Sequence, residues 1–255
     1  LQAVAHGSDT VQYFQWRAGR GGSEKFHSAV VNHDGTEHTR IFRGVAEVGE
    51  VLKRMDGIVG ASVEPQVAVM FDVDNRWALE AAQGPRQEHR DYEETATAHY
   101  RPFWDMGVPV DVIAHDHDLS QYKLLIAPML YMVRQETADR IAEFVRQGGT
   151  LVLTYWSGIV DEHDRCYMAF RPGPLAEVMG IRDEDTDALY EDESNAMTIR
   201  DDDGLNLAKS YSCSLYCDII HADDARVLGS YAGDFYADTP ALTVHEYGQG
   251  RAYYV

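Results

Sequence analysis

The sequence contains only three cysteines and four lysines, and it lacks long apolar runs. The cysteines, Cys166, Cys213 and Cys217, form no regular framework, which favours reduced thiols in a cytoplasmic protein. No segment reaches the ~20 apolar residues that a membrane-spanning helix needs. The formal charge of −20 repels nucleic acid phosphates and anionic lipids. We therefore expect a cytoplasmic protein that binds neither nucleic acid nor membrane.

Two common motifs are also missing. There is no Gly-X-Ser-X-Gly nucleophile elbow. No Gly-X-Gly-X-X-Gly follows the first strand of the main domain, which argues against a dinucleotide, and we expect no cofactor. Cys213 and Cys217 lie four apart in a β-prone segment, so they would share one face of a strand. A disulfide or a metal pair is possible there, but structural thiols are favoured because no further Cys or His completes a metal site.

The first part of the sequence has the order of a single α/β repeat. We expect a helix end before Gly7, a buried strand at Val11–Phe14, a glycine-rich loop and an amphipathic helix at Thr39–Met55. A lone strand cannot satisfy its own edges, so this repeat should either pack on something absent from the chain or be partly disordered. A domain rarely begins with the end of a helix, so the start looks like a truncation, and Ala61–Pro65 is a plausible linker.

A different pattern begins at residue 66. Apolar strands alternate with helices, which predicts an open parallel sheet with helices on both faces. The expected strands are 66–71, 110–114, 124–128, 150–156, 227–231, 242–246 and 252–255, and the expected helices are 96–106, 135–147 and 174–179. Residues 75–94 read as a long polar segment, and 183–203 as an exposed acidic hairpin or insertion.

The loop after Val11–Phe14 carries the best candidate site. Glu24 and His27 lie three residues apart, and a charged acceptor beside a donor can hold sugar hydroxyls. Trp16 could form a flat platform for a sugar ring or belong to a core, and Glu24 and His27 could equally form a surface ion pair. Arg17 and Arg20 could orient the carboxylates or simply lie on the surface.

Two other clusters are weaker candidates. The sequence His115-Asp-His117-Asp118 looks like a metal site, although such runs are common in acidic loops. The segment Asp161-Glu-His-Asp164 follows the fourth strand, at the sheet edge where ligands bind in open α/β proteins. A solvated charge run remains the simpler interpretation of that segment.

Several motifs together carry a family resemblance. Gln2-Ala-Val-Ala-His-Gly7, Phe14-Gln-Trp-Arg17 and Glu24-Lys-Phe-His27-Ser resemble the last barrel unit of glycoside hydrolase family 42 β-galactosidases. Gln66-Val-Ala-Val-Met-Phe-Asp72 and Thr154-Tyr-Trp-Ser-Gly-Ile-Val-Asp-Glu162 are similar to the middle domain of the same family. The order of these unlike motifs makes the resemblance specific, and it covers nearly all of the chain.

The resemblance implies the organisation of the chain. Residues 1–62 would be the last β/α unit of a truncated (β/α)₈ TIM barrel. Residues 66–255 would be a trimerisation domain with a flavodoxin-like, class I glutamine-amidotransferase-like open parallel sheet. The parent would be a cytoplasmic homotrimer that hydrolyses terminal β-D-galactosides with retention of configuration.

The resemblance also implies the roles of the site residues. Trp16, Glu24 and His27 would contact the galactose in the innermost subsite. Retaining hydrolysis needs two carboxylic acids about 5 Å apart, and in the family both glutamates lie on earlier barrel strands. We therefore expect no catalytic residue and no metal site in this chain. The alternatives are a non-catalytic amidotransferase-like binding or oligomerisation module and, more weakly, a metal-dependent hydrolase centred on His115, His117 and Asp161.

Overall fold

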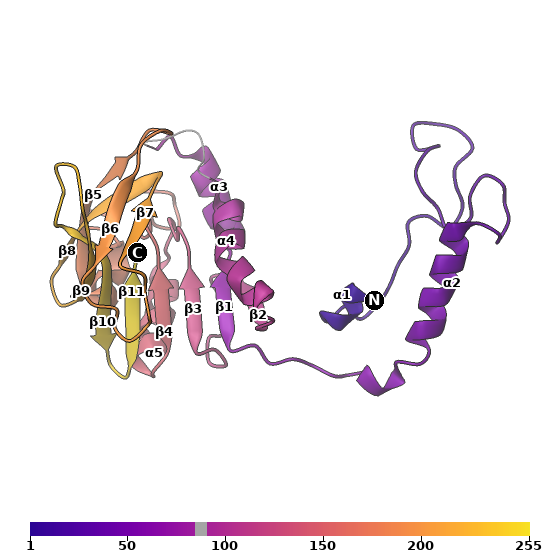
Figure 1. Ribbon diagram of the computed structural model, residues 1–255, viewed down its shortest axis with the longest axis horizontal. Coiled ribbons are helices and arrows are strands. Elements are labelled where there is room, and N and C mark those ends of the chain that lie inside the picture. Colours follow the sequence, from indigo (N-terminus) through magenta and orange to yellow (C-terminus); the bar gives the residue numbers. More distant parts are fainter. Residues whose placement is uncertain (85–90) are drawn as a thin grey trace. The chain divides into compact units, whose positions relative to one another are not determined.

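The computed structural model in Figure 1 describes residues 1–84 and 91–255. The chain divides into two units, Leu1–Val63 and Glu64–Val255, each with its own internal contacts. None of the described helices is both long enough and apolar enough to cross a membrane.

The first unit contains helix α1 (Gln2–Ala5), helix α2 (Arg40–Leu52) and a short 3₁₀ turn at Asp56–Ile58. The predicted amphipathic helix is confirmed as α2, and it begins at Thr39, whose Oγ1 accepts a hydrogen bond from the Phe42 N–H at 3.2 Å. No residue of α2 is buried. The apolar face of the helix is therefore only partly covered within this unit.

The prediction of a buried strand at Val11–Phe14 is wrong. The segment forms no strand, and the side chains of Val11, Tyr13 and Phe14 are all exposed. A strand needs a neighbour to pair its backbone groups, and the unit supplies none beside this segment. The nearest approach to a strand pair is a single parallel bridge between Arg17 and Val31.

The second unit is built on one large sheet with the strand order β2-β1-β3-β4-β11-β10-β9-β6-β7. The first five strands are parallel: β2 (Val110–Ile113), β1 (Val67–Met70), β3 (Leu124–Ala127), β4 (Thr150–Leu153) and β11 (Gly250–Tyr254). The antiparallel part consists of β10 (Pro240–Tyr247), β9 (Arg226–Tyr231), β6 (Asn195–Ile199) and β7 (Ser210–Cys213). A separate antiparallel pair is formed by β5 (Ile181–Ala188) and β8 (Tyr216–Ala222).

Helices cover both faces of the parallel part, as the alternation of strands and helices predicted (Figure 1). They are α3 (Val73–Ala81), α4 (Tyr92–Asp105), α5 (Gln135–Arg146) and α6 (Ala176–Met179), with a 3₁₀ turn at Gly173–Leu175. On β1, Ala68 and Met70 share a core with α5, whereas Val69 packs with Ala96 of α4. Successive strand residues therefore face opposite helices. The chain is an α/β protein with a mixed sheet, so the expected open parallel sheet is correct only for five strands, since β10, β9, β6 and β7 pair antiparallel.

Two expectations about polar segments need correction. Within 75–94, α3 forms where only a polar segment was expected, because Asp72 caps it and Ala78 and Leu79 bury one face; residues 85–90 lie outside the described part. The stretch 183–203 is not an exposed insertion. It contains most of β5 and all of β6, and the Asp183 side chain is fully buried in the protein interior.

Candidate functional site

The glycine-rich loop of the first unit is closed at its base by backbone hydrogen bonds. Val31 N–H donates to the Trp16 carbonyl at 2.8 Å, and Val30 N–H donates to the Gln15 carbonyl at 3.1 Å. Ala18, Ala29, Val30 and Val31 are buried beneath these bonds. The base of the loop is therefore fixed, while the residues between Gly19 and Ser28 face outward.

The structure places the three predicted binding residues on this loop and its base. Glu24 and His27 share one turn, in which the His27 N–H donates to the Glu24 carbonyl at 2.9 Å. Both side chains are exposed. Trp16 is 65% exposed and packs edge-to-face on Phe42 of α2, with 6.4 Å between the ring centroids. The turn thus places Glu24 and His27 on the same exposed loop, and a contact with α2 orients the indole.

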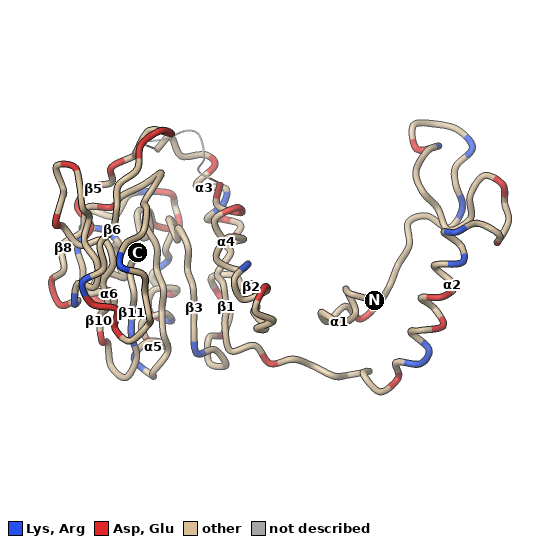
Figure 2. Tube along the Cα trace, viewed as in Figure 1, with Lys and Arg blue, Asp and Glu red and all other residues tan. Residues whose placement is uncertain are grey.

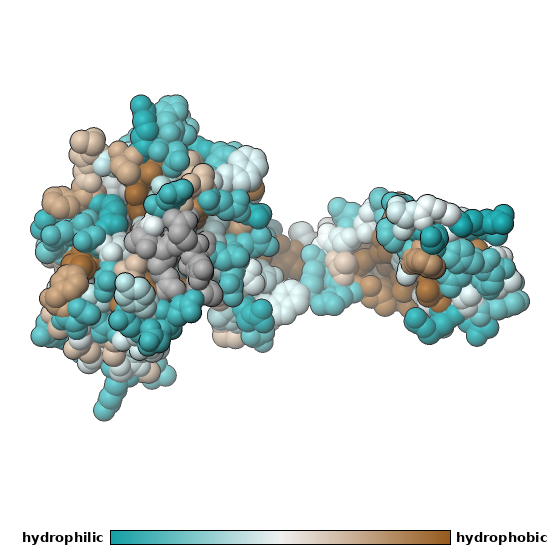
Figure 3. Space-filling model, turned by 90° about the horizontal axis from the view of Figure 1, so that it is seen from above, coloured by the Kyte–Doolittle hydropathy of each residue, from teal (hydrophilic) through white to brown (hydrophobic). Residues whose placement is uncertain are grey.

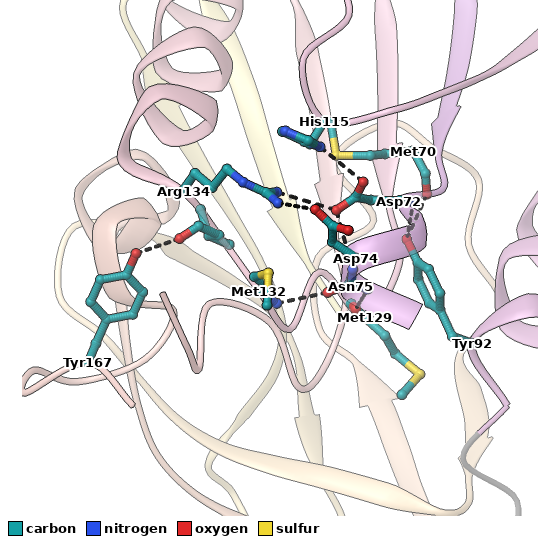
Figure 4. Close-up of polar contacts among 11 residues, drawn as sticks. Met70, Asp72, Asp74, Asn75, Tyr92, His115, Met129, Met132, Arg134 and Tyr167 are labelled. Carbon is teal, nitrogen blue, oxygen red and sulfur yellow. Dashed lines mark hydrogen bonds and ion pairs between the residues drawn. The ribbon is translucent and has the colours of Figure 1, made fainter. Parts of the chain in front are cut away.

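A second polar cluster lies at the carboxyl ends of three parallel strands (Figure 4). Asp72 follows β1, and its Oδ1 interacts with Nδ1 of His115, after β2, at 2.9 Å. Its Oδ2 lies 3.5 Å from Nη1 of Arg134, which also pairs with Asp74. This is the sheet edge where open α/β folds bind ligands. Here, however, the Asp72 and Asp74 carboxylates form ion pairs with the Arg134 guanidinium. The cluster therefore mainly holds the loops after the strands in place.

Asn75 completes this cluster from the first turn of α3. It is fully buried; its Nδ2 donates to the Met129 carbonyl at 3.1 Å, and its Oδ1 accepts from the Met132 N–H at 2.8 Å. A buried side chain that satisfies two backbone groups is costly to remove, because both are left without a partner.

The Asn75→Ala substitution is expected to lower the free energy of unfolding by about 2 kcal/mol. Urea unfolding followed by circular dichroism measures this loss. The matched control is Gln121→Ala, which removes an exposed amide bonded to Asp111 and should change stability by less than about 0.5 kcal/mol. Equal effects of both substitutions would contradict the role given to Asn75.

The structure does not gather the residues of the suggested metal site. His115 is bound to Asp72, the His117 ring lies beside Tyr122, and Asp118 accepts hydrogen bonds from Ser120. Asp161 accepts from the His163 and Arg165 backbone N–H groups, so its loop folds on itself. Across residues 1–84 and 91–255, no group of three or more His, Cys, Asp or Glu residues is placed to hold a metal ion.

Cys213 and Cys217 do not share one face of a strand, contrary to expectation. Cys213 ends β7 and Cys217 lies on β8, because the chain turns between them at Leu215, whose φ is +72°. All three cysteines are free thiols. Burial raises the pKa of Cys217 to about 11 and also raises that of Cys213. Both thiols therefore stay protonated at neutral pH and are poor nucleophiles.

The sequence analysis missed a buried acidic cluster. Asp183 on β5 accepts a hydrogen bond from Arg171 at 2.9 Å. Arg171 also donates to the Thr186 hydroxyl. That hydroxyl donates in turn to Asp218 on β8 at 2.6 Å. The other oxygen of Asp218 accepts from Tyr254 at 2.6 Å and from a backbone N–H after β4 at 2.8 Å. Burial, followed by repulsion from Asp218, raises the pKa of Asp183 to about 9. Only Asp218 gave a signal, because it lies among the mostly apolar residues of β8, whereas Asp183 lies in the acidic strand β5.

The fold is that of an α/β protein with two units, and comparison with known protein families identifies the family to which the chain belongs. The family model described as the β-galactosidase trimerisation domain matches residues 65–255, and the one described as β-galactosidase matches residues 1–55. The chain belongs to the glycoside hydrolase family 42 β-galactosidases, as its motifs indicated.

Individual relatives match over the whole chain. β-Galactosidase Pbg of Clostridium perfringens is 55% identical, and β-galactosidase BglY of Alicyclobacillus acidocaldarius is 51% identical, each over 255 residues. The crystal structure of the β-galactosidase from Bacillus circulans sp. alkalophilus superposes with a TM-score of 0.95 at 46% identity. This chain spans 37% of the length of the two curated relatives and 38% of the crystallised chain.

Proposed function

We propose that this chain is part of a retaining β-galactosidase that hydrolyses terminal β-D-galactosides, in which it supplies substrate-contacting residues and the assembly domain. The match to β-galactosidases along the entire chain carries this proposal. Because the chain spans little more than a third of those relatives, the two catalytic glutamates would lie in the part not covered.

In this proposal, residues 1–62 are the last β/α unit of a (β/α)₈ barrel, and residues 66–255 are the trimerisation domain. The surface of the first unit supports this division. Hydrophobic residues lie exposed on it (Figure 3), among them Phe14, Trp16 and Phe26. Such surface normally becomes buried against neighbouring elements, which the other units of a barrel would provide.

The parallel strands of the second unit support the finer fold assignment. Their order, β2-β1-β3-β4-β11, corresponds to the 2-1-3-4-5 order of flavodoxin-like sheets. We propose that the domain shares the amidotransferase-like fold without its chemistry. The residue with positive φ in the turn after β3 is Met129, which is buried and carries no nucleophile.

Trp16, Glu24 and His27 would form one wall of the galactose subsite. A carboxylate and an imidazole on the same turn can accept and donate hydrogen bonds to neighbouring sugar hydroxyls. The exposed indole offers an apolar face for the sugar ring. This arrangement binds and orients the substrate, and the acid, base and nucleophile would come from elsewhere in the parent enzyme.

The parent is proposed to be a cytoplasmic homotrimer. The description of the matched domain supports self-assembly, and three free cysteines suit a reducing compartment. With a formal charge of −20, the chain is a poor ligand for nucleic acid or anionic lipid, so neither is proposed as a partner.

A chimera tests the proposed function directly. This chain would replace the matching 255 residues of the Clostridium perfringens relative, and hydrolysis of a chromogenic β-galactoside would be measured. We expect turnover by the chimera and none by the 255-residue chain alone. A folded but inactive chimera, or turnover by the isolated chain that depends on Glu24, would overturn the assignment.

The Glu24→Gln substitution in the active chimera is expected to lower kcat/KM about 100-fold, because a charge-assisted hydrogen bond to the sugar becomes a weaker neutral one. Glu37→Gln, which changes another exposed glutamate of the same unit, is the control and should leave kcat/KM unchanged. Initial rates over a range of substrate concentrations separate kcat from KM. An unchanged kcat/KM for Glu24→Gln would remove Glu24 from the subsite.

A further inference from the structure

The turn Asn32–Gly35 comes directly after the closed base of the glycine-rich loop. The Gly35 N–H closes this turn by donating to the Asn32 carbonyl at 3.0 Å. The residue before the turn, Val31, is buried, and its carbonyl accepts a hydrogen bond from the Ala18 N–H at 2.9 Å. The turn is therefore held in a fixed position beside the start of the loop.

His33 of this turn binds the first residue of the outward-facing part of the loop. Its Nε2 lies 2.9 Å from the carbonyl oxygen of Gly19. A carbonyl oxygen can only accept a hydrogen bond, so the imidazole carries a proton on Nε2 and is the donor. The bond thus connects the fixed turn to the point where the loop leaves its base.

Little else holds the backbone of the loop beyond Gly19. At Gly21 and Gly22, no atom lies within 4 Å of the point that a Cβ would occupy. In the part of the chain that the structure describes, the next backbone hydrogen bond along the loop lies within it, from the His27 N–H to the Glu24 carbonyl. Because glycine has more backbone freedom than other residues, this segment depends on its end point at Gly19 for its position.

The charged side chains of the loop do not fix it either. Charges of both signs lie on the loops of the first unit (Figure 2), and Arg20, Glu24 and Lys25 are all exposed. None of these three forms an ion pair with another described residue, and Lys25 instead lies over the Phe26 ring, 5.3 Å from its centroid. The His33 bond is therefore the last described hydrogen bond between the first half of the loop and the rest of the unit.

We propose that His33 is a positioning residue for galactoside binding, because it limits the movement of the loop that carries Glu24 and His27. This inference rests on the proposed function, in which that loop forms part of the galactose subsite. His33 acts through the loop, since its Nε2–H is already bound to the Gly19 carbonyl. A loop that samples fewer conformations loses less entropy when the substrate binds, so the bond lowers KM.

Kinetics of the active chimera test the proposal. The His33→Ala substitution is expected to raise KM about 5-fold and to leave kcat nearly unchanged, because a looser loop weakens binding of the ground state and the transition state alike. A smaller folded fraction would have the opposite signature, since it lowers the apparent kcat and leaves KM unchanged. The ratio of the two effects therefore distinguishes positioning from a loss of folded enzyme.

Two further variants isolate the hydrogen bond. His33→Gln keeps a side-chain N–H at a similar distance from the backbone, and it should bring KM back to within about 2-fold of the unmodified value. His38→Ala is the control, at an exposed histidine of the same unit whose described hydrogen bond uses only its backbone N–H. It should leave both KM and kcat unchanged.

Limited digestion with trypsin measures the order of the loop without relying on catalysis. Arg20 and Lys25 are exposed cleavage sites within the loop. In the chimera, His33→Ala should be cleaved at these sites about 5-fold faster than the unmodified protein, because cleavage follows local opening. His33→Gln should be cleaved at nearly the unmodified rate.

The possible results separate this inference from the proposed function. If Glu24→Gln lowers kcat/KM while His33→Ala changes neither KM nor cleavage, the positioning role is overturned and the galactose subsite stands. Faster cleavage of His33→Ala without a higher KM would also overturn the role, since the loop would be looser without any effect on binding. A raised KM that His33→Gln does not restore would show that the hydrogen bond is not the cause. A folded but inactive chimera would overturn the proposed function and this inference together.

Discussion

The Gly158→Ala substitution is expected to lower the free energy of unfolding of the second unit by about 4 kcal/mol or more. Gly158 has a φ of +64°, and a Cβ at this position would lie 2.1 Å from the Pro172 carbonyl oxygen. Two further backbone atoms of Pro172 lie within 2.7 Å of the same point. Backbone cannot rotate away as a side chain would. The substitution must therefore separate the segment after β4 from the segment that leads to α6.

A matched glycine isolates the contribution of the backbone angle. Gly204 has a φ of +75°, but no atom lies within 4 Å of the point that a Cβ would occupy there. Gly204→Ala should therefore cost only the strain of the left-handed conformation, about 1 kcal/mol. Urea unfolding of both variants separates steric clash from strain. If the two substitutions lower the free energy of unfolding equally, the close contact with Pro172 is not the reason that position 158 requires glycine.

The Asp183→Asn substitution is expected to stabilise the protein increasingly as the pH rises. In the folded chain, burial and the nearby Asp218 raise the pKa of Asp183 to about 9, whereas an unfolded aspartate titrates near about 4. Between these values the unfolded chain has released a proton that the folded chain keeps. The free energy of unfolding contributed by Asp183 is therefore complete below about pH 4 and falls by about 1.4 kcal/mol per pH unit until about pH 9.

An asparagine cannot titrate, so the substitution removes this slope. From pH 5 to pH 8, the difference in unfolding free energy between Asp183→Asn and the unmodified chain should grow by about 4 kcal/mol in favour of the variant. Denaturant unfolding at each pH measures the difference. Asp192→Asn, at an exposed aspartate in the loop between β5 and β6, should follow the unmodified chain. Parallel curves for Asp183→Asn and the unmodified chain would show that Asp183 is ionised when folded.

The parts of the fold that could be predicted are those with a strong local pattern. Four apolar runs identified the strands β1 to β4, and the spacing of apolar residues identified α2 and α5. Val11–Phe14 has the composition of a strand but no partner in its unit, and pairing is not a local property. The acidic stretch 183–203 was expected to be an exposed hairpin or insertion because of its polarity. Instead its strands pair with β8 and β9, which are distant in the sequence.

The candidate sites show a similar division. The family motifs identified Trp16, Glu24 and His27, and the structure adds the closed loop base that supports them. Their contact with galactose stays a prediction. The Arg171, Asp183 and Asp218 cluster could not be assembled from the sequence, since its members come from three segments that meet only after folding. Neither could the hydrogen bond between His33 and the Gly19 carbonyl, because it joins two loops that meet only after folding.

The position of β11 has a consequence for how the protein folds. It lies in the sheet between β4 and β10, yet nearly all of the antiparallel part separates it from β4 in the sequence. During synthesis, the edge of β4 would stay open until residues 250–254 emerge and pair with it. Such distant pairing slows folding and exposes an apolar strand edge meanwhile. The nascent chain should therefore be most prone to aggregation, and most dependent on chaperones, just before β11 inserts.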